Sequence, residues 1–295
     1  MHRLRLRLKW FVILVTLIMA AMGVAYGDDA ATATQPNADA DAPPLWELGV
    51  MVAAARLPDY IGSDEYENYL YPLPYVIYRG EFLRADRDGI RGIFYRGKRF
   101  ETNLSFWGNP PVPDDNEARQ GMPELDAVGE GGPALRYYFY RRGWKDHLFL
   151  QAAWRTAFSF DFDGGVDADY QGWNGDLNLN YQNKSSFEDQ DLSFYFKAGL
   201  HFADSLYNEY FYGVPSQYAT PTRNAFKADG GYSGFSVSTS VYKSFTPVFS
   251  LGFYARWNNV NSAVFEDSPL VREDNNYAVG CLAVWKLAQS SKPAR

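Results

Sequence analysis

Apolar and polar side chains alternate with a period of two along much of this chain, most clearly from about Phe249 to Leu287. One stretch shows the whole pattern: Phe249, Leu251, Phe253, Ala255 and Trp257 alternate with Ser250, Gly252, Tyr254, Arg256 and Asn258. Such alternation predicts a β-strand with one apolar and one polar face. About a dozen strands of this kind behind a secretory signal are typical of an outer-membrane barrel, apolar outside and wet inside.

The first 27 residues predict a cleaved secretory signal peptide. An apolar run from Trp10 to Val24 ends at Ala25-Tyr26-Gly27, which offers small residues where a signal peptidase cuts. Four basic residues precede the run: Arg3, Arg5, Arg7 and Lys9. The alternative is an anchoring helix, but 15 apolar residues fall short of the ~20 that a spanning helix needs.

Composition narrows the class of protein further. Removal of the four basic residues of the signal takes the formal net charge from −7 to −11, and an acidic chain argues against nucleic acid as a partner. Cys281 is the single cysteine, so no intramolecular disulfide can form. No stretch after residue 27 is long and apolar enough for a membrane helix, which leaves a closed β-barrel as the way to span a membrane.

We expect an all-β protein whose main domain is a transmembrane antiparallel β-barrel of about twelve strands, with both chain termini in the periplasm. The expected segments are a signal peptide (1–27), a disordered lead-in (28–44), the barrel (45–287) and a polar, disordered periplasmic tail (288–295). Pro72 and Pro74 suit an edge, a bulge or the barrel rim. The predicted strands are 46–56, 69–78, 81–86, 90–95, 100–107, 128–140, 147–159, 173–182, 192–202, 231–243, 249–260 and 276–287.

Connections between the predicted strands alternate between short and long, as expected for periplasmic turns and extracellular loops. Only the connection 86–89 breaks the pattern. The short turns are rich in Arg and Lys, and the long loops are rich in Asp and Glu. An acidic outer rim has two explanations, ordinary solvation with divalent cations bridging to lipopolysaccharide, or a field that concentrates cations at the mouth; we favour the first.

Alternation also predicts which charged side chains point into the lumen. Such groups either pair with one another and plug the barrel or line a narrow aqueous path, since twelve strands lie between filled eight-stranded barrels and open porins. The lumen candidates are Arg136, Arg155, Lys197, His201 and Arg256, with Glu47, Glu101 and Asp176 as acidic counterparts.

Several loops are more specific than a barrel requires. The first is Pro58-Asp59-Tyr60-Ile61-Gly62-Ser63-Asp64, followed by Pro72-Leu73-Pro74-Tyr75. Later come Tyr210-Phe211-Tyr212-Gly213-Val214 and Phe265-Glu266-Asp267-Ser268-Pro269-Leu270-Val271. In their order and spacing these motifs resemble the MipA/OmpV family of outer-membrane proteins, from Trp46 to Leu287.

The resemblance implies an outer-membrane β-barrel without known catalytic residues or cofactors. One branch of that family is described as a scaffold between a membrane-bound lytic transglycosylase and a penicillin-binding protein, and other branches have porin-like, stress-related or adhesive roles. The residues that carry the resemblance are the motif-loop candidates Asp59, Tyr60, Gly62, Ser63, Asp64, Tyr212, Gly213, Val214, Asp267, Ser268 and Pro269.

Catalytic and metal chemistry find little support in the residues. His147 and His201 are the histidines after the signal, and no G-x-S-x-G motif supplies a nucleophile. The acidic loop Asp161 to Asp169 lacks the Gly and Glu positions of an EF-hand. Cys281 alternates with lipid-facing residues and is expected to act as a small hydrophobe.

The C-terminal end departs from the usual barrel pattern. Outer-membrane barrels usually finish on an aromatic residue, whereas here the last predicted strand reaches Trp285-Lys286-Leu287 and the chain continues to Arg295. The sequence thus predicts a non-enzymatic scaffold in the outer membrane of a Gram-negative bacterium, in contact with lipid and lipopolysaccharide. The alternative is a small-solute channel with a preference for cations.

Overall fold

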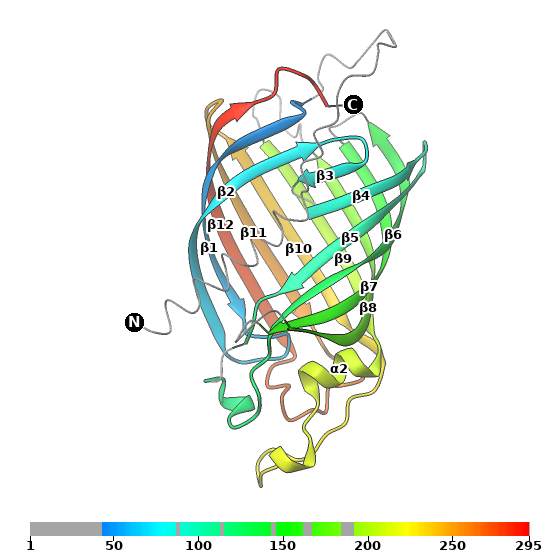
Figure 1. Ribbon diagram of the computed structural model, residues 1–295, viewed down its shortest axis with the longest axis vertical. Coiled ribbons are helices and arrows are strands. Elements are labelled where there is room, and N and C mark those ends of the chain that lie inside the picture. Colours follow the sequence, from blue (N-terminus) through cyan, green and yellow to red (C-terminus); the bar gives the residue numbers. More distant parts are fainter. Residues whose placement is uncertain are drawn as a thin grey trace.

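The chain forms one closed antiparallel barrel of twelve strands (Figure 1). The computed structural model describes residues 43–86, 89–112, 115–142, 146–161, 167–183 and 192–294. The strands are β1 (Trp46–Pro58), β2 (Tyr66–Arg79), β3 (Leu83–Asp86), β4 (Gly89–Arg96), β5 (Phe100–Asn109), β6 (Ala127–Arg142), β7 (Asp146–Asp161), β8 (Asp167–Asn183), β9 (Leu192–Ala203), β10 (Gly231–Ser244), β11 (Phe249–Asn259) and β12 (Asn275–Gln289). The predicted all-β antiparallel barrel and all twelve predicted strands are confirmed.

Each strand pairs with its sequence neighbours, and β1 closes the barrel against β12. The closing ladder runs from Glu47 opposite Gln289 to Arg56 opposite Val279. Both described ends of the chain therefore lie at one end of the barrel, which we call the terminus end, and the opposite end is the loop end (Figure 1).

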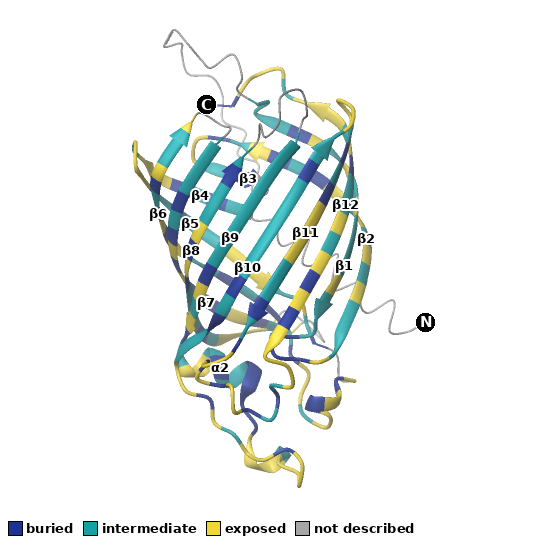
Figure 2. Cartoon of the chain, turned by 180° about the vertical axis from the view of Figure 1, so that it is seen from behind, coloured by how far each residue is buried: buried dark blue, intermediate teal, exposed yellow. Residues whose placement is uncertain are grey.

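Burial alternates along the strands as the period-two pattern predicts (Figure 2). On β7, Phe149, Gln151 and Ala153 are buried inside, whereas Trp154 is 48% exposed on the outside. On β11 and β12 the outward residues Phe253 and Val279 are 60% and 50% exposed. The outer wall is therefore a band of apolar side chains, and the inside carries polar groups such as Gln151 beside apolar ones such as Phe149.

The loop end carries the only helices in the described part of the chain: the α-helix α2 (Ser205–Tyr212) and two short 3-10 helices, η1 (Glu117–Arg119) and η2 (Ser216–Tyr218). Asp204 caps α2, since its Oδ1 accepts a hydrogen bond from the Tyr207 N–H at 2.9 Å. Sequence periodicity predicted a long loop at this position and did not indicate the helix.

One part of the barrel wall is incomplete, because β3 and β4 are short. Among the described residues, only Tyr78 and Arg79 of β2 pair with β3, so the edge of β2 from Tyr66 to Ile77 has no strand partner on that side. The Arg79 N–H donates to the Leu45 carbonyl at 2.7 Å, so odd-numbered backbone groups of β2 face β1 and even-numbered groups face the open edge. The connection 86–89, which departs from the predicted alternation of short and long connections, joins β3 to β4, and these strands pair up to Asp86 and Gly89.

The C-terminal tail differs from the expected disordered segment. Strand β12 continues to Gln289, and Pro293 then bridges to Pro44. The Leu45 N–H donates to the Lys292 carbonyl at 2.9 Å, and the Ala294 N–H donates to the Pro43 carbonyl at 2.8 Å. The tail is ordered because the chain just before β1 offers it a backbone partner.

The predicted signal peptide and all of the predicted lead-in except Pro43 and Pro44 lie outside the described residues. Within the described residues, no helix has both the length and the apolar character needed to cross a membrane.

Candidate functional site

Four connections at the loop end pack into one hydrophobic cluster, which we call the loop cap: residues 59–65, 110–126 without 113–114, 204–230 and 260–274. Its centre is nearly inaccessible, with Leu270 and Val260 at 0% exposure and Phe265 at 1%. Residues that are 210 positions apart in the sequence meet here: the Tyr60 hydroxyl donates a hydrogen bond to the Leu270 carbonyl at 2.7 Å. The cap is therefore a packed core of its own and not a set of independent loops.

Aromatic contacts organise the loop cap. The rings of Tyr212 and Phe265 stack with centroids 3.6 Å apart, and the Tyr60 ring meets Tyr212 edge-on at 6.3 Å. The Tyr212 hydroxyl donates to the Ile61 carbonyl at 2.9 Å. Burial raises the pKa of Tyr60 and Tyr212 above the ordinary tyrosine value, so both remain hydrogen-bond donors through the neutral range.

The structure brings the three groups of motif-loop residues together in the loop cap. Gly62 has a φ of 101°, a conformation that favours glycine. Its N–H donates to Asn276 Oδ1 at 2.5 Å, and its carbonyl accepts from the N–H groups of Arg272 and Glu273 at 2.7 and 3.1 Å. The Ser268 hydroxyl donates to the Tyr212 carbonyl at 2.7 Å. Motif segments far apart in sequence thus hold one another in place.

The remaining motif residues divide between structure and surface. Asp59 accepts a hydrogen bond from Asn116 at 2.8 Å, and the fully buried Ser63 accepts one from the same amide at 3.3 Å. The Gly213 N–H ends α2 by donating to the Glu209 carbonyl at 2.8 Å, and Val214 bridges to Phe226. The other motif residues lie toward the surface, Asp64 and Asp267 exposed and Pro269 half-buried.

Two buried arginines in the loop cap were missed by the sequence reasoning. Arg223 Nη1 donates to the carbonyls of Ala118 and Gln120, both at 3.0 Å, and Arg119 Nη1 donates to the Phe211 carbonyl at 3.1 Å. Burial lowers the pKa of Arg119. Because their partners are backbone carbonyls of other loops, no residue spacing in the sequence indicates these contacts.

Inside the terminus end, Glu101 collects three arginines. It accepts from Arg96 at 2.9 Å and from Arg141 at 3.2 Å, and Arg136 lies 3.8 Å away. Arg136 also donates to Gln151 at 2.7 Å. Two basic residues of the predicted periplasmic turns, Arg96 and Arg141, therefore turn inward instead of standing free at the rim.

Midway along the barrel, Arg155 pairs with Asp176 at 2.5 Å. Arg155 Nε also donates to the Ser105 hydroxyl at 3.0 Å, and Asn178 donates to the second oxygen of Asp176. The lumen candidates Arg136 and Arg155 thus lie inside the barrel in paired, buried positions, 6% and 7% exposed.

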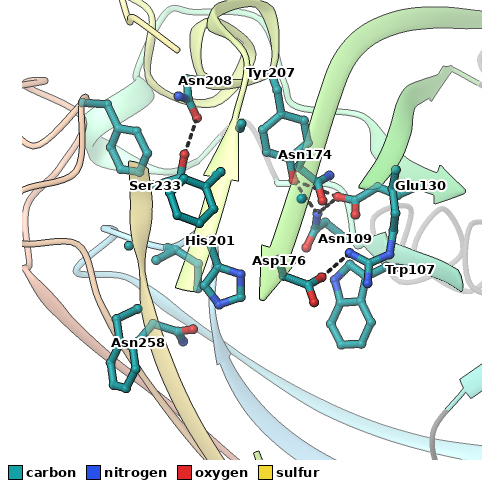
Figure 3. Close-up of a pocket in the computed structure, with 18 of the residues that line it drawn as sticks. Trp107, Asn109, Glu130, Asn174, Asp176, His201, Tyr207, Asn208, Ser233 and Asn258 are labelled. Carbon is teal, nitrogen blue, oxygen red and sulfur yellow. Dashed lines mark hydrogen bonds and ion pairs between the residues drawn. The ribbon is translucent and has the colours of Figure 1, made fainter. Parts of the chain in front are cut away.

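A chamber of about 170 Å³ lies between these pairs and the loop cap (Figure 3). Its basic lining residues are Arg155, Lys197 and Arg256, and its acidic ones are Glu130 and Asp176. Glu130 accepts from the Tyr207 hydroxyl at 2.8 Å and from Asn109 at 3.3 Å. The remaining lumen candidates, Lys197, His201 and Arg256, are therefore gathered around a single space.

The match to a known protein family covers nearly the whole barrel, from β1 to β12. The family model described as MltA-interacting protein MipA matches residues 49–287. The chain belongs to the MipA family. No curated protein matches the chain.

Solved structures resemble this MipA-family barrel only distantly. A bacterial polysaccharide outer membrane secretin is 9% identical over 81% of this chain and 98% of its own, with a TM-score of 0.35. The outer membrane protease OmpT from Escherichia coli is 10% identical over 82% and 95%, with a TM-score of 0.27. The CymD monoaromatic hydrocarbon channel is 11% identical over 83% and 89%, with a TM-score of 0.28. At these TM-scores the likenesses carry no argument about function.

One pair in the MipA-family lumen has the composition of a nucleophile and a base. His201 Nε2 lies 2.8 Å from the Ser236 hydroxyl. Within the described part of the chain, no second hydrogen bond holds the His201 ring, so the orienting acceptor that activates such a pair in hydrolases is missing. The geometry therefore favours a structural hydrogen bond.

Metal binding and cysteine chemistry gain no positive support from the MipA-family barrel. Among the described residues, no cluster of three His, Cys, Asp or Glu side chains is arranged to hold a metal ion. The centre of the acidic loop, residues 162–166, lies outside the described residues. Cys281 is exposed on the outer face of β12.

Proposed function

We propose that this MipA-family barrel is a non-enzymatic scaffold in the outer membrane that holds murein-remodelling enzymes at its terminus end. The observation that carries the proposal is the loop cap, whose hydrophobic core closes the loop end with residues such as Phe265 and Leu270. A barrel closed at that end presents the opposite rim as its working face. Family membership supports a lytic transglycosylase as one partner, and a penicillin-binding protein is the second partner we propose.

The outer wall supports placement in a membrane. Apolar side chains such as Leu70, Phe94 and Phe253 are 60–70% exposed on it, and soluble proteins rarely expose so continuous an apolar surface. We place the chain in the outer membrane of a Gram-negative bacterium after removal of residues 1–27. The wall then contacts lipid, and the loop end contacts lipopolysaccharide.

The terminus end offers a partner a cationic rim. Lys98 and Arg99 are exposed in the β4–β5 turn, and the Arg142 side chain is 79% exposed at the end of β6. Aromatic and aliphatic side chains lie at the same end, with Phe82 and Leu287 exposed by 77% and 71%. Basic and apolar groups side by side suit a partner surface with acidic residues around an apolar centre.

Capture from solubilised membranes tests the scaffold. The wild-type barrel is expected to enrich a lytic transglycosylase and a penicillin-binding protein, and the triple variant Lys98→Glu, Arg99→Glu, Arg142→Glu is expected to lose at least tenfold of that enrichment. Lys227→Glu, an exposed charge reversal at the loop end, is the matched control. Equal capture by all three proteins, or enrichment of neither enzyme, rules the proposal out.

A small-solute channel is the second candidate, favoured by the chamber of about 170 Å³ in the lumen. The acidic residues of the loops would give such a channel a preference for cations. Planar-bilayer recording of the refolded barrel tests it, because a scaffold with a closed loop cap gives no steady conductance. Absence of conductance above the bilayer background would eliminate the channel.

A further inference from the structure

Two basic side chains that line the chamber come from neighbouring positions of the barrel wall. Lys197 on β9 and Arg256 on β11 both lie opposite Ser238 on β10, so they flank one small residue at the same level of the barrel. In the described part of the chain neither makes an ion pair, and both line the chamber. Both side chains are partly buried, and an unpaired charge in such a position loses part of its hydration without compensation.

The carboxylates that line the chamber are already engaged. Asp176 is held by Arg155 at 2.5 Å and by Asn178. Glu130 is held by Tyr207 and Asn109 on the side of the loop cap. The positive charge of Lys197 and Arg256 is therefore available to an anion that enters the chamber.

Unused hydrogen-bond donors surround the same space. The Nδ2 of Asn258, a residue only 3% exposed, has no acceptor within the described residues, and neither has Nε of Arg256. Asn258 lies opposite Ser236, which is hydrogen-bonded to His201. Figure 3 shows His201, Asp176 and Asn258 around the open part of the chamber.

Small residues occupy the lumen wall beside this space. Gly199, Ser236 and Ser238 occupy neighbouring lumen positions on β9 and β10. A Cβ on Gly199 would collide with the side-chain oxygen of Asn178. Among the described residues, the chamber therefore brings together two cations without an ion pair, Lys197 and Arg256, and the unused amide donor of Asn258.

We propose that the chamber binds a small oxyanion, with Lys197, Arg256 and Asn258 as its ligands. A volume of about 170 Å³ corresponds to roughly five or six water molecules, which suits a phosphate or a carboxylate group and not a drug-sized molecule. The anion enters from the aqueous phase, since the side chains that bind it all line the lumen. Binding at this site does not depend on the proposed scaffold role. It gives the lumen a preference for anions, opposite to the cation preference that the acidic loops suggest.

Isothermal titration of the refolded full-length barrel in uncharged detergent tests the site, with inorganic phosphate and acetate as probes. Phosphate is expected to bind, and Lys197→Met and Arg256→Met are each expected to weaken binding at least tenfold. Lys227→Met removes an exposed basic side chain at the loop end and is expected to bind phosphate as the wild type does. Failure of both probes to bind, or equal binding by all four proteins, overturns the proposal.

Thermal unfolding separates loss of the site from loss of the fold. Because an unpaired charge in a partly buried position destabilises, the double variant Lys197→Met, Arg256→Met is expected to unfold at a higher temperature than the wild type without phosphate. Phosphate is expected to stabilise the wild type and to leave the double variant unchanged. A double variant that melts at a lower temperature in the absence of phosphate, or that phosphate stabilises as much as the wild type, contradicts the assignment. Conductance plays no part in this test, so it stands apart from both proposed functions.

Discussion

The ring of Tyr212 lies flat on the ring of Phe265, with 3.6 Å between the centroids and 9° between the planes. The two residues come from different loops, and each lies within a family motif: Tyr212 in residues 210–214 and Phe265 in residues 265–271. The contact therefore joins the motif loops directly, and the stability of the loop cap should depend on it.

Replacing Phe265 by Ala is expected to weaken the loop cap by about 3–5 kcal/mol, the usual cost of deleting a buried aromatic ring. Hydrogen exchange at the cap amides measures this, because each 1.4 kcal/mol is a factor of ten in protection. Phe245→Ala, at an exposed ring of the terminus end, is the control. Unchanged cap protection in Phe265→Ala would show that the stack is not the core of the cap.

Gly62→Ala is expected to cost about 1–2 kcal/mol, because alanine is strained at a φ of 101°. The amides of Arg272 and Glu273, which donate to the Gly62 carbonyl, should lose protection first. Gly92→Ala provides the comparison, since a Cβ there meets nothing closer than 3.9 Å. Equal effects of the two substitutions would disprove a special role for the Gly62 backbone.

Glu101→Gln leaves three arginines without their shared carboxylate. Removing one partner from a buried ion pair costs about 3–5 kcal/mol, and the Glu101 side chain is 2% exposed. The urea midpoint of the refolded barrel should fall accordingly. Glu81→Gln, at an exposed position beside the same end, is expected to change the midpoint little, and a Glu101→Gln midpoint equal to it would refute the prediction.

Alkaline pH is expected to loosen the loop cap. Burial raises the pKa of Tyr210 to about 12 and raises those of Tyr60, Tyr207 and Tyr212 as well. An unfolded tyrosine ionises near pH 10, so above that pH the unfolded cap loses protons that the folded cap keeps, and its stability falls as pH rises.

Hydrogen exchange is too fast at high pH, so limited proteolysis of residues 204–230 between pH 9 and 12 follows this opening. Cleavage should stay slow up to about pH 10 and accelerate above it. A rate that rises uniformly from pH 9, or that never rises, would contradict the assignment to buried tyrosines.

Much of the barrel was predictable, because the period of two is a local property of the chain. Side chains such as Gln151 and Arg155 point into the lumen simply because their neighbours are apolar. The exception at 86–89 was visible as an irregular connection, but its meaning required the pairing of β2 with β3, which depends on residues distant in sequence.

The loop cap and the chamber were beyond the reach of the sequence. Arg223 binds the Ala118 carbonyl across 105 positions, and nothing in either segment indicates the other. The tail was predicted to be disordered from its polar composition, yet backbone hydrogen bonds from Leu45 and Ala294 do not depend on side-chain polarity. Amino-acid composition therefore does not predict contacts that are made by backbone groups.

The open edge of β2 determines how this barrel can meet other chains. The even-numbered residues that face it include Pro72 and Pro74, whose nitrogens carry no hydrogen. A foreign strand laid along this edge would find its carbonyls without donors at two consecutive positions of the ladder. The two prolines therefore make this incomplete part of the wall a poor template for fibre growth or strand exchange.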